Sequence, residues 1–343
     1  GVLIPAEGKP LLLIGPESFS YASDRSRIPD IRLLKAFRES SEPEYPGKPL
    51  DTFLSVFDEA LGGKRIHRVG VAGLSLMTVG VYGALREALD DYSAGSLKNS
   101  IPIEKADSIV ADMRMIKSEN ELNCMRAAAK ITRETMDYVI EQIRPGMTET
   151  QVVGLALGKM HELGAERESY PLWVLTGKGS HQAISRPRQK VIRSGDMTFL
   201  QFGARVAGYA SSIGRTVVFG KMTAEQRSLI DAGYRAQEAV IRNLKTGAHA
   251  MQIARAHEEN VRSLGYGEWL LYGPCHGNGL MEGEAPWIET SSDFTLETDM
   301  TFCVDIFLGS PEKEIGLRME DVACVKPDGA EVLTDYPRLF WEL

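Results

Sequence analysis

The chain has 343 residues, of which 43% are hydrophobic and 25% charged, and its formal net charge is −8. This length suffices for two domains with a well-buried core, and the composition is that of a soluble globular protein. The negative charge provides no basic face for nucleic acid or for an anionic membrane, so we expect neither as a partner.

No segment contains the roughly 18 consecutive apolar residues needed to span a membrane, and no signal peptide is recognisable. The cysteines lack CxxC spacing and lie mostly in apolar contexts, at Cys124, Cys275, Cys303 and Cys324. We therefore expect buried, reduced thiols and a cytoplasmic location. The chain opens at Gly1 just ahead of a strand-like run, so we also expect that the true N-terminus is missing.

Residues 1–112 are expected to form a small α/β domain. A strand hairpin is predicted where two apolar runs flank the turn Gly8-Lys9-Pro10, and a polar loop is predicted at Pro16–Pro29. Apolar spacing then predicts further elements in chain order: a helix near 51–61, a strand at Val69–Ala72 and a helix near 77–90.

From Ser118 onward the pattern changes to long amphipathic helices. Three of them are predicted to begin with a capping box, at Ser118/Glu121, Thr148/Gln151 and Thr223/Gln226. Two helix pairs also share a glycine break and a Leu-Gly end, and the same spacing separates Gly146 from Gly164 and Gly247 from Gly265. This repetition predicts two similar α/β halves that face each other across a pocket.

The strongest chemical signal lies on three extended segments near the C-terminal end. They carry His276, Asp305 and Glu320, and a histidine with two carboxylates can converge in one pocket. An acid in an apolar strand, such as Asp305, is costly without a partner. We predict that these three residues form the reactive group, with Glu320 as a structural partner of Arg318 or Arg215 as the alternative.

Two upstream strands should complete this pocket, but they carry Gln201 and Ser212 where a metal site needs acids. Neutral amide and hydroxyl groups hold divalent ions far more weakly than carboxylates do. We predict that Gln201 and Ser212 instead form neutral hydrogen bonds to a substrate. Trp173 and Tyr209 are expected either to line the pocket or to pack in the core.

Several motifs occur in a characteristic order. They are Gly195-Asp196 with Phe202-Gly203, Gly208-Tyr209 with Arg215-Thr216, His276-Gly277 with Gly279-Leu280, and Arg318-Met319-Glu320-Asp321-Val322. Over residues 113–343 the chain therefore resembles the pita-bread family, which includes methionine aminopeptidase, aminopeptidase P, prolidase and creatinase. Residues 1–112 resemble the end of the N-terminal domain of the prolidase and creatinase branch. The resemblance implies an α/β chain with a pseudo-twofold C-terminal domain, assembled as a homodimer.

Family peptidases hold two divalent ions with two Asp, one His and two Glu. The His corresponds to His276 and the last Glu to Glu320, whereas Asp305 replaces the other Glu and Gln201 and Ser212 replace both Asp. Because four carboxylates fall to two, we do not expect a two-ion centre. We expect no cofactor; a single divalent ion on His276, Asp305 and Glu320 is the alternative.

A second departure lies in the loop after His276. Family peptidases place a His before the acid that matches Glu284, and here that position is Gly283. Glu284 is expected either to bind substrate or to order the loop. His181 aligns with the histidine that acts as general acid and base in metal-free creatinase, although creatinase carries a Glu where this chain has Gly214.

We therefore predict a hydrolase that cleaves a C–N bond in a small zwitterionic or cationic substrate without metal. In this hypothesis His181 transfers the proton, while His276, Asp305 and Glu320 orient the substrate and stabilise charge. One alternative is a peptidase similar to Xaa-Pro dipeptidase, with one ion or none and a dipeptide-like substrate. Another is a non-catalytic module that binds peptides.

Overall fold

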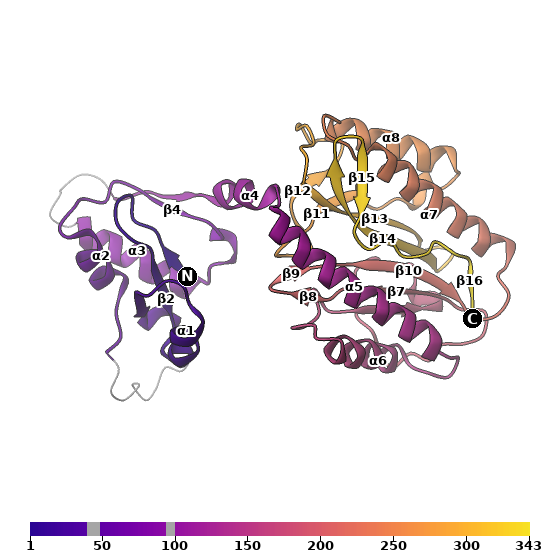
Figure 1. Cartoon of the computed structure of the whole chain (residues 1–343), viewed down its shortest axis with the longest axis horizontal. Helices are drawn as coiled ribbons and strands as arrows, with labels where there is room; N and C mark the ends of the chain where they lie inside the picture. Colours follow the sequence, from indigo (N-terminus) through magenta and orange to yellow (C-terminus); the bar gives the residue numbers. More distant parts are fainter. Residues whose placement is uncertain (40–48, 94–99) are drawn as a thin grey trace. The chain divides into compact units, whose positions relative to one another are not determined.

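The computed structural model describes residues 1–39, 49–93 and 100–343. These residues fall into two compact units, Gly1–Val110 and Ala111–Leu343 (Figure 1). None of the helices within the described ranges is long and apolar enough to cross a membrane.

The first unit is a small α/β unit, and the predicted hairpin in it is confirmed. Strand β1 pairs antiparallel with β2, which pairs in parallel with β3, and β4 pairs in parallel with β5. The bounds are β1 Val2–Leu3, β2 Leu11–Ile14, β3 Ile31–Leu33, β4 Val69–Val71, β5 Ile103–Lys105, α2 Phe53–Leu61 and α3 Val79–Ser93.

The prediction of a loop at Pro16–Pro29 is wrong. A 3-10 turn at Pro16–Ser18 leads into helix α1, Phe19–Arg25. Only Ala22 of this helix is buried, so the sequence carries no apolar stripe that could indicate a helix. Pro16 fits the first turn because its fixed φ angle and missing N–H suit that position.

Three of the helices that follow begin where the capping boxes predict, namely α5, α6 and α7. Ser118, Thr148 and Thr223 each accept a hydrogen bond from the backbone N–H three residues later, and the Glu or Gln there returns a bond. The bounds are α4 Asp107–Met115, α5 Glu119–Gln142, α6 Glu149–Glu162, α7 Ala224–Asn243 and α8 Ala250–Ser263.

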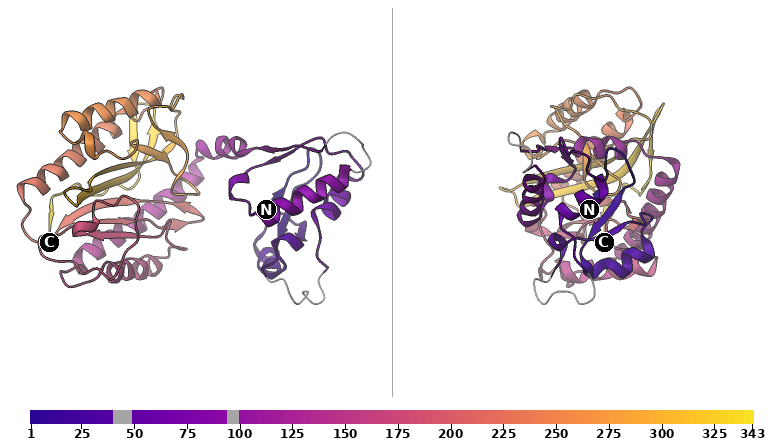
Figure 2. Two further views of the ribbon diagram at one scale, coloured as in Figure 1. Left: turned by 180° about the vertical axis from the view of Figure 1, so that it is seen from behind. Right: turned by 90° about the vertical axis from the view of Figure 1, so that its left-hand side faces the viewer.

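The predicted repeat is visible in the second helix of each pair. Helices α6 and α8 both contain 14 residues, and both end in a Leu followed by a glycine. Those glycines, Gly164 and Gly265, have φ angles of 92° and 87°, a left-handed conformation that favours glycine at the end of a helix. Helices α5 and α6 lie beside one half of the sheet, and α7 and α8 lie beside the other (Figures 1 and 2).

A nine-stranded sheet joins the two halves. Its main path runs β12-β11-β13-β14-β10-β7-β6, while β15 pairs with β14 and β16 with β10. A separate hairpin is formed by β8 Arg205–Val206 and β9 Tyr209–Ala210. The sheet strands are β6 Trp173–Thr176, β7 Met197–Phe202, β10 Ile213–Val218, β11 Cys275–Gly277, β12 Glu284–Ile288, β13 Thr301–Ser310, β14 Ile315–Lys326, β15 Gly329–Val332 and β16 Trp341–Glu342.

The two faces of β13 and β14 have different roles. Alternate residues, including Val304 and Met319, pack into the apolar core together with residues of α7 and α8. Because side chains alternate along a strand, their neighbours Cys303, Asp305 and Glu320 emerge on the opposite face. This alternation places the predicted reactive residues together on the side of the sheet away from that core.

Candidate functional site

Three neighbouring strands carry His276, Asp305 and Glu320, the residues that the sequence predicts to be reactive. His276 on β11 lies opposite Cys303 on β13, and Asp305 on β13 lies opposite Glu320 on β14. Glu320 is fully buried and Asp305 is 6% exposed.

Gln201 on β7 reaches Glu320 across the intervening strand. Gly214 on β10 is paired with both residues, and the Gln201 amide N–H donates to Glu320 Oε2. A Cβ at position 214 would lie 3.0 Å from the Cβ of Glu320 and 3.2 Å from the Cγ of Arg318. The glycine therefore keeps open the space through which the amide and the carboxyl group meet.

Arg318 is the cation of this group, and the sequence identified it only as a possible partner of Glu320. Its guanidinium donates to the carbonyl oxygen of the Gln201 side chain and to the hydroxyl of Tyr272. The guanidinium also stacks 4.9 Å from the ring of Trp173, a favourable cation–π arrangement. Burial lowers the pKa of Arg318, but Asp305 and its other neighbours raise it more, so the group stays charged.

Asp305 is bound mainly by these neighbours. Its Oδ2 accepts a hydrogen bond of 2.8 Å from the Tyr272 hydroxyl and lies 3.6 Å from Arg318 Nη1. Its Oδ1 is buried without a hydrogen-bond partner among the described residues. One carboxylate oxygen is therefore engaged and the other is available.

Glu320 is fully buried beside two other carboxyl groups, which disfavours its charged form. Burial raises the pKa of its carboxyl group well above the usual range, and the negative charges of Asp305 and Glu282 raise it further. Within the described ranges its buried Oε1 has no hydrogen-bond partner. These causes favour the protonated form of the carboxyl group, while the positive charge of Arg318 opposes it.

His276 faces a second carboxylate that the sequence did not predict. Its Nδ1 lies 3.1 Å from the backbone oxygen of Gly277; since a carbonyl only accepts, a neutral His276 carries its proton on Nδ1 and its lone pair on Nε2. That Nε2 lies 3.6 Å from Glu282 Oε1. Ligand atoms of His276, Glu282, Cys303 and Glu320 all lie within 4.8 Å of one another.

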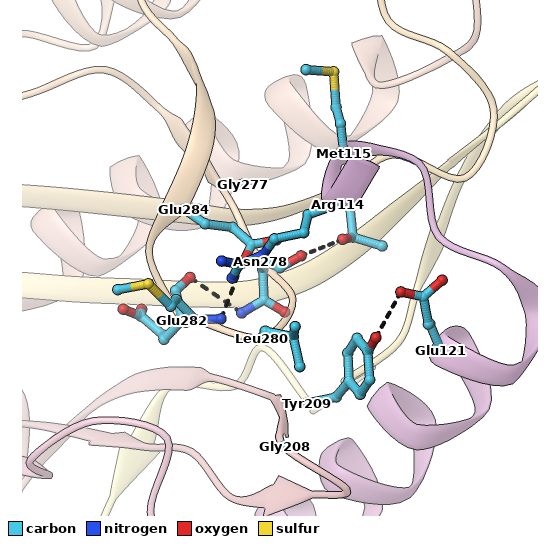
Figure 3. A network of polar contacts seen from close by, with 12 residues as sticks. Arg114, Met115, Glu121, Gly208, Tyr209, Gly277, Asn278, Leu280, Glu282 and Glu284 are labelled. Atoms are coloured by element: carbon cyan, nitrogen blue, oxygen red, sulfur yellow. Dashed lines mark hydrogen bonds and ion pairs between the residues drawn. The ribbon is translucent and has the colours of Figure 1, made fainter. Parts of the chain in front are cut away.

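Glu284 anchors the loop that follows His276. Its carboxylate pairs with Arg114 and with Lys117, the latter at 3.2 Å, and accepts the backbone N–H of Met281 (Figure 3). Both of its oxygens are thus engaged. Of the two predicted roles, this arrangement favours loop ordering over substrate binding.

The other predicted residues are distributed around this group. Trp173 lines it through its contact with Arg318, and Ser212 exchanges a 2.8 Å hydrogen bond with Tyr170. Tyr209 lies beside α5 and donates to Glu121 (Figure 3). His181 Nδ1 lies 2.7 Å from the carbonyl oxygen of Lys178. Nowhere in the described chain does a hydrogen bond or ion pair join His181 to the residues around Glu320.

Sequence reasoning missed Cys303, Glu282 and Tyr272 as members of the site. Cys303 stands two positions before Asp305, and side chains two apart on a strand share a face. This periodicity could therefore have predicted Cys303 as a member of the site. Glu282 and Tyr272 lie outside the strands, where no periodicity indicates the direction of a side chain.

The fold and the clustered buried acids define a hydrolase of the pita-bread class. The family model of metallopeptidase family M24 matches residues 123–327, and the chain belongs to this family of C–N bond hydrolases. The chain is 25% identical over 334 residues to a Pyrococcus horikoshii protein named Xaa-Pro dipeptidase, covering 97% of this chain and 88% of that one. It is 27% identical over 273 residues to the uncharacterized peptidase YqhT of Bacillus subtilis, covering 80% and 74%.

Solved structures show the same fold. The X-Pro aminopeptidase of Thermotoga maritima superposes with a TM-score of 0.84 at 24% identity, covering 100% of this chain and 88% of that one. The prolidase of Pyrococcus furiosus superposes with a TM-score of 0.81 at 22% identity, covering 98% and 90%. The predicted pita-bread fold with a preceding N-terminal domain is thereby confirmed.

The residues of this chain do not fit the two-ion centre that the family resemblance implies. The Gln201 amide already bridges Glu320 and Arg318, and the Ser212 hydroxyl bonds to Tyr170. Asp305 is engaged by Arg318 and Tyr272. Two closely spaced divalent ions need several bridging and flanking carboxylates, and Gln201 and Ser212 offer none, while Asp305 is already held by Arg318 and Tyr272.

Proposed function

We propose that this protein hydrolyses a C–N bond in a small, zwitterionic, dipeptide-like substrate, using His276, Asp305 and Glu320 but not a pair of ions. The names of the Pyrococcus relatives, Xaa-Pro dipeptidase, support dipeptides as the first substrates to test.

The observation that carries this proposal is a set of unpaired buried polar atoms of both kinds. Within the described part of the chain, Asp305 Oδ1 and Glu320 Oε1 are acceptors without a hydrogen-bond donor, while Trp173 Nε1 and Arg318 Nε are donors without an acceptor. Each unpaired buried polar group costs about 1–3 kcal/mol. A zwitterionic ligand offers an ammonium group to the acceptors and a carboxylate to the donors, so its binding removes these penalties.

The proposal allows two forms of the chemistry. In the metal-free form predicted from the sequence, His181 transfers the proton; its Nδ1 is engaged by Lys178, which leaves Nε2 for that task. In the other form one divalent ion takes part. Gln201 and Ser212 are compatible with either form, and the acceptor atoms that converge near His276 favour one ion.

The test is hydrolysis of a substrate panel by the purified protein and by two matched variants. The panel contains Xaa-Pro dipeptides, other dipeptides, and creatine-like and cyclic amidine compounds. Glu320→Gln should lower kcat/KM by about a hundredfold or more, since it removes an ionisable group from the reacting site. Glu312→Gln, an exposed change in the turn after β13, should leave it unchanged.

Two results would refute this proposal. One is equal activity of Glu320→Gln and Glu312→Gln on every substrate that is cleaved. The other is a rise in melting temperature on adding a dipeptide without turnover of any compound, which identifies a binding module instead.

A further inference from the structure

We infer that one divalent ion of borderline softness, Zn²⁺ by preference, binds to His276, Glu282, Cys303 and Glu320. The inference deepens the proposed function, because it places an ion in the site where hydrolysis is proposed. Two of these ligands, Glu282 and Cys303, are outside the ligand set that the family resemblance implies. The site is therefore a relocated single-ion site rather than half of a two-ion centre.

The first argument is geometric. The four ligand atoms lie within 4.8 Å of one another, and His276 Nε2 is 3.6 Å from Glu282 Oε1. Zinc bonds of about 2.0–2.3 Å in a tetrahedron place ligand atoms about 3.4–3.7 Å apart. The histidine and Glu282 already have this spacing, and no pair of the four ligand atoms exceeds it by more than about an ångström.

The second argument is that acceptor atoms meet here with little to satisfy them. The lone pair of a neutral His276 faces the Glu282 carboxylate, and among the described residues the weak donor beside the fully buried Glu320 is the Cys303 thiol. Acceptors that face one another at short range repel unless a proton or a cation lies between them. A single ion satisfies the nitrogen, both carboxylates and the sulfur together.

The third argument is the balance of charge. Glu282, Asp305 and Glu320 bring three carboxylates to this face, and Arg318 is the cation that faces them. Arg318 lies beside Asp305 and bonds to Gln201 rather than to Glu282. Buried carboxyl groups are retained when they are protonated, paired or bound to a metal; Arg318 pairs with Asp305, so Glu282 and Glu320 are the two carboxyl groups open to a divalent cation.

The donor atoms select the class of ion. A cysteine sulfur, which releases its proton when it binds a metal, and an imidazole favour Zn²⁺ or Co²⁺ over Mg²⁺, Ca²⁺ and Mn²⁺, which prefer oxygen ligands. Asp305 is not among the converging ligands, because Tyr272 and Arg318 hold it. The ion is therefore placed on the His276 side of the site, and not on the His276, Asp305 and Glu320 triad expected from the sequence.

The experiment measures ion binding directly, without turnover. The full chain is stripped with chelator and titrated with Zn²⁺ and with Co²⁺, and bound metal, melting temperature and absorption are recorded. We expect one ion per chain, a higher melting temperature, and a thiolate-to-cobalt charge-transfer band. Cys303→Ser should abolish that band, and both Cys303→Ser and Glu282→Gln should weaken binding by at least about tenfold.

Cys275→Ser is the matched control, because Cys275 is also a buried strand cysteine but lies outside the four ligands. It should keep the ion and the band. Circular dichroism verifies that each variant is folded. If Cys303→Ser does not fold, Glu282→Gln alone tests the site.

Several outcomes separate the two proposals. No bound ion, or unchanged binding in Cys303→Ser and Glu282→Gln, overturns the relocated site and leaves metal-free hydrolysis standing. One ion without hydrolysis of any substrate overturns the proposed function and leaves the site standing. Two tightly bound ions per chain contradict both.

Discussion

Replacing Gln201 by Met tests whether this side chain connects the two halves of the site. The change keeps an unbranched side chain of similar length but removes the amide. Glu320 then loses the donor on Oε2, and Arg318 loses the acceptor for Nη1. Both of these groups are buried, so water cannot replace the lost bonds without opening the site.

The size of the effect follows from the two bonds. Hydrogen bonds to charged groups contribute about 1.5–3 kcal/mol each, so two of them amount to about 3–6 kcal/mol. If Glu320 is protonated, its bond has the smaller value of about 0.5–1.5 kcal/mol. The expected loss in free energy of unfolding is therefore about 2–5 kcal/mol, a large share of the stability of a domain.

Urea denaturation monitored by circular dichroism measures this loss, with Gln237→Met as the control. Gln237 is equally buried, donates to the Val304 carbonyl and accepts from Arg338, but lies on α7 away from the site. Both variants should be destabilised, and only Gln201→Met should also reduce hydrolysis. A loss below about 1 kcal/mol for Gln201→Met would mean that its bonds are not the connection described here.

Further changes test other parts of the molecule. Burial lowers the pKa of His257 from 6.5 to about 4, so the unfolded chain binds the proton more tightly. The free energy of unfolding should therefore have its full value above about pH 6.5 and fall by up to about 3 kcal/mol as the pH drops toward 4. Urea denaturation at a series of pH values measures this fall, and His257→Leu should remove it. Gly214→Ala should cost about 1–3 kcal/mol by overpacking and lower kcat/KM, because its Cβ meets Glu320 and Arg318; a variant as stable and active as the parent contradicts this. His181→Ala should lower kcat by about a hundredfold or more if His181 transfers the proton, and unchanged pH–rate profiles would remove that role.

Much of the fold could be predicted because its signals are local. The capping boxes at Ser118, Thr148 and Thr223 involve residues three positions apart, and all three are formed. The alternation along β13 and β14 likewise determines which side chains share a face. Helix α1 was missed because it buries only Ala22, which leaves no periodic signal for a helix.

The site could be predicted only where a strand carries the residue. The neighbouring strands β11, β13 and β14 bring His276, Asp305 and Glu320 together as expected. The bridge from Gln201 to Glu320 depends instead on both residues being paired with Gly214, and register between distant strands is not encoded locally. Glu282 lies in a loop, so its approach to His276 appears only in three dimensions.

The distribution of charge in the site connects the loss of the family acid at position 201 with the appearance of Glu282 and Cys303 as ligands. Arg318 is stacked on Trp173 and hydrogen-bonded to Gln201, which holds a permanent cation beside Asp305. An acid at position 201 would compete with Asp305 for that cation and would add repulsion to Glu320, whereas the neutral amide bonds to both. Arg318 and Gln201 thus occupy the part of the site beside Asp305. The carboxyl groups that Arg318 does not neutralise lie on the other side, near His276. A second cation is favourable there, where Glu282 and Cys303 complete the set of ligands.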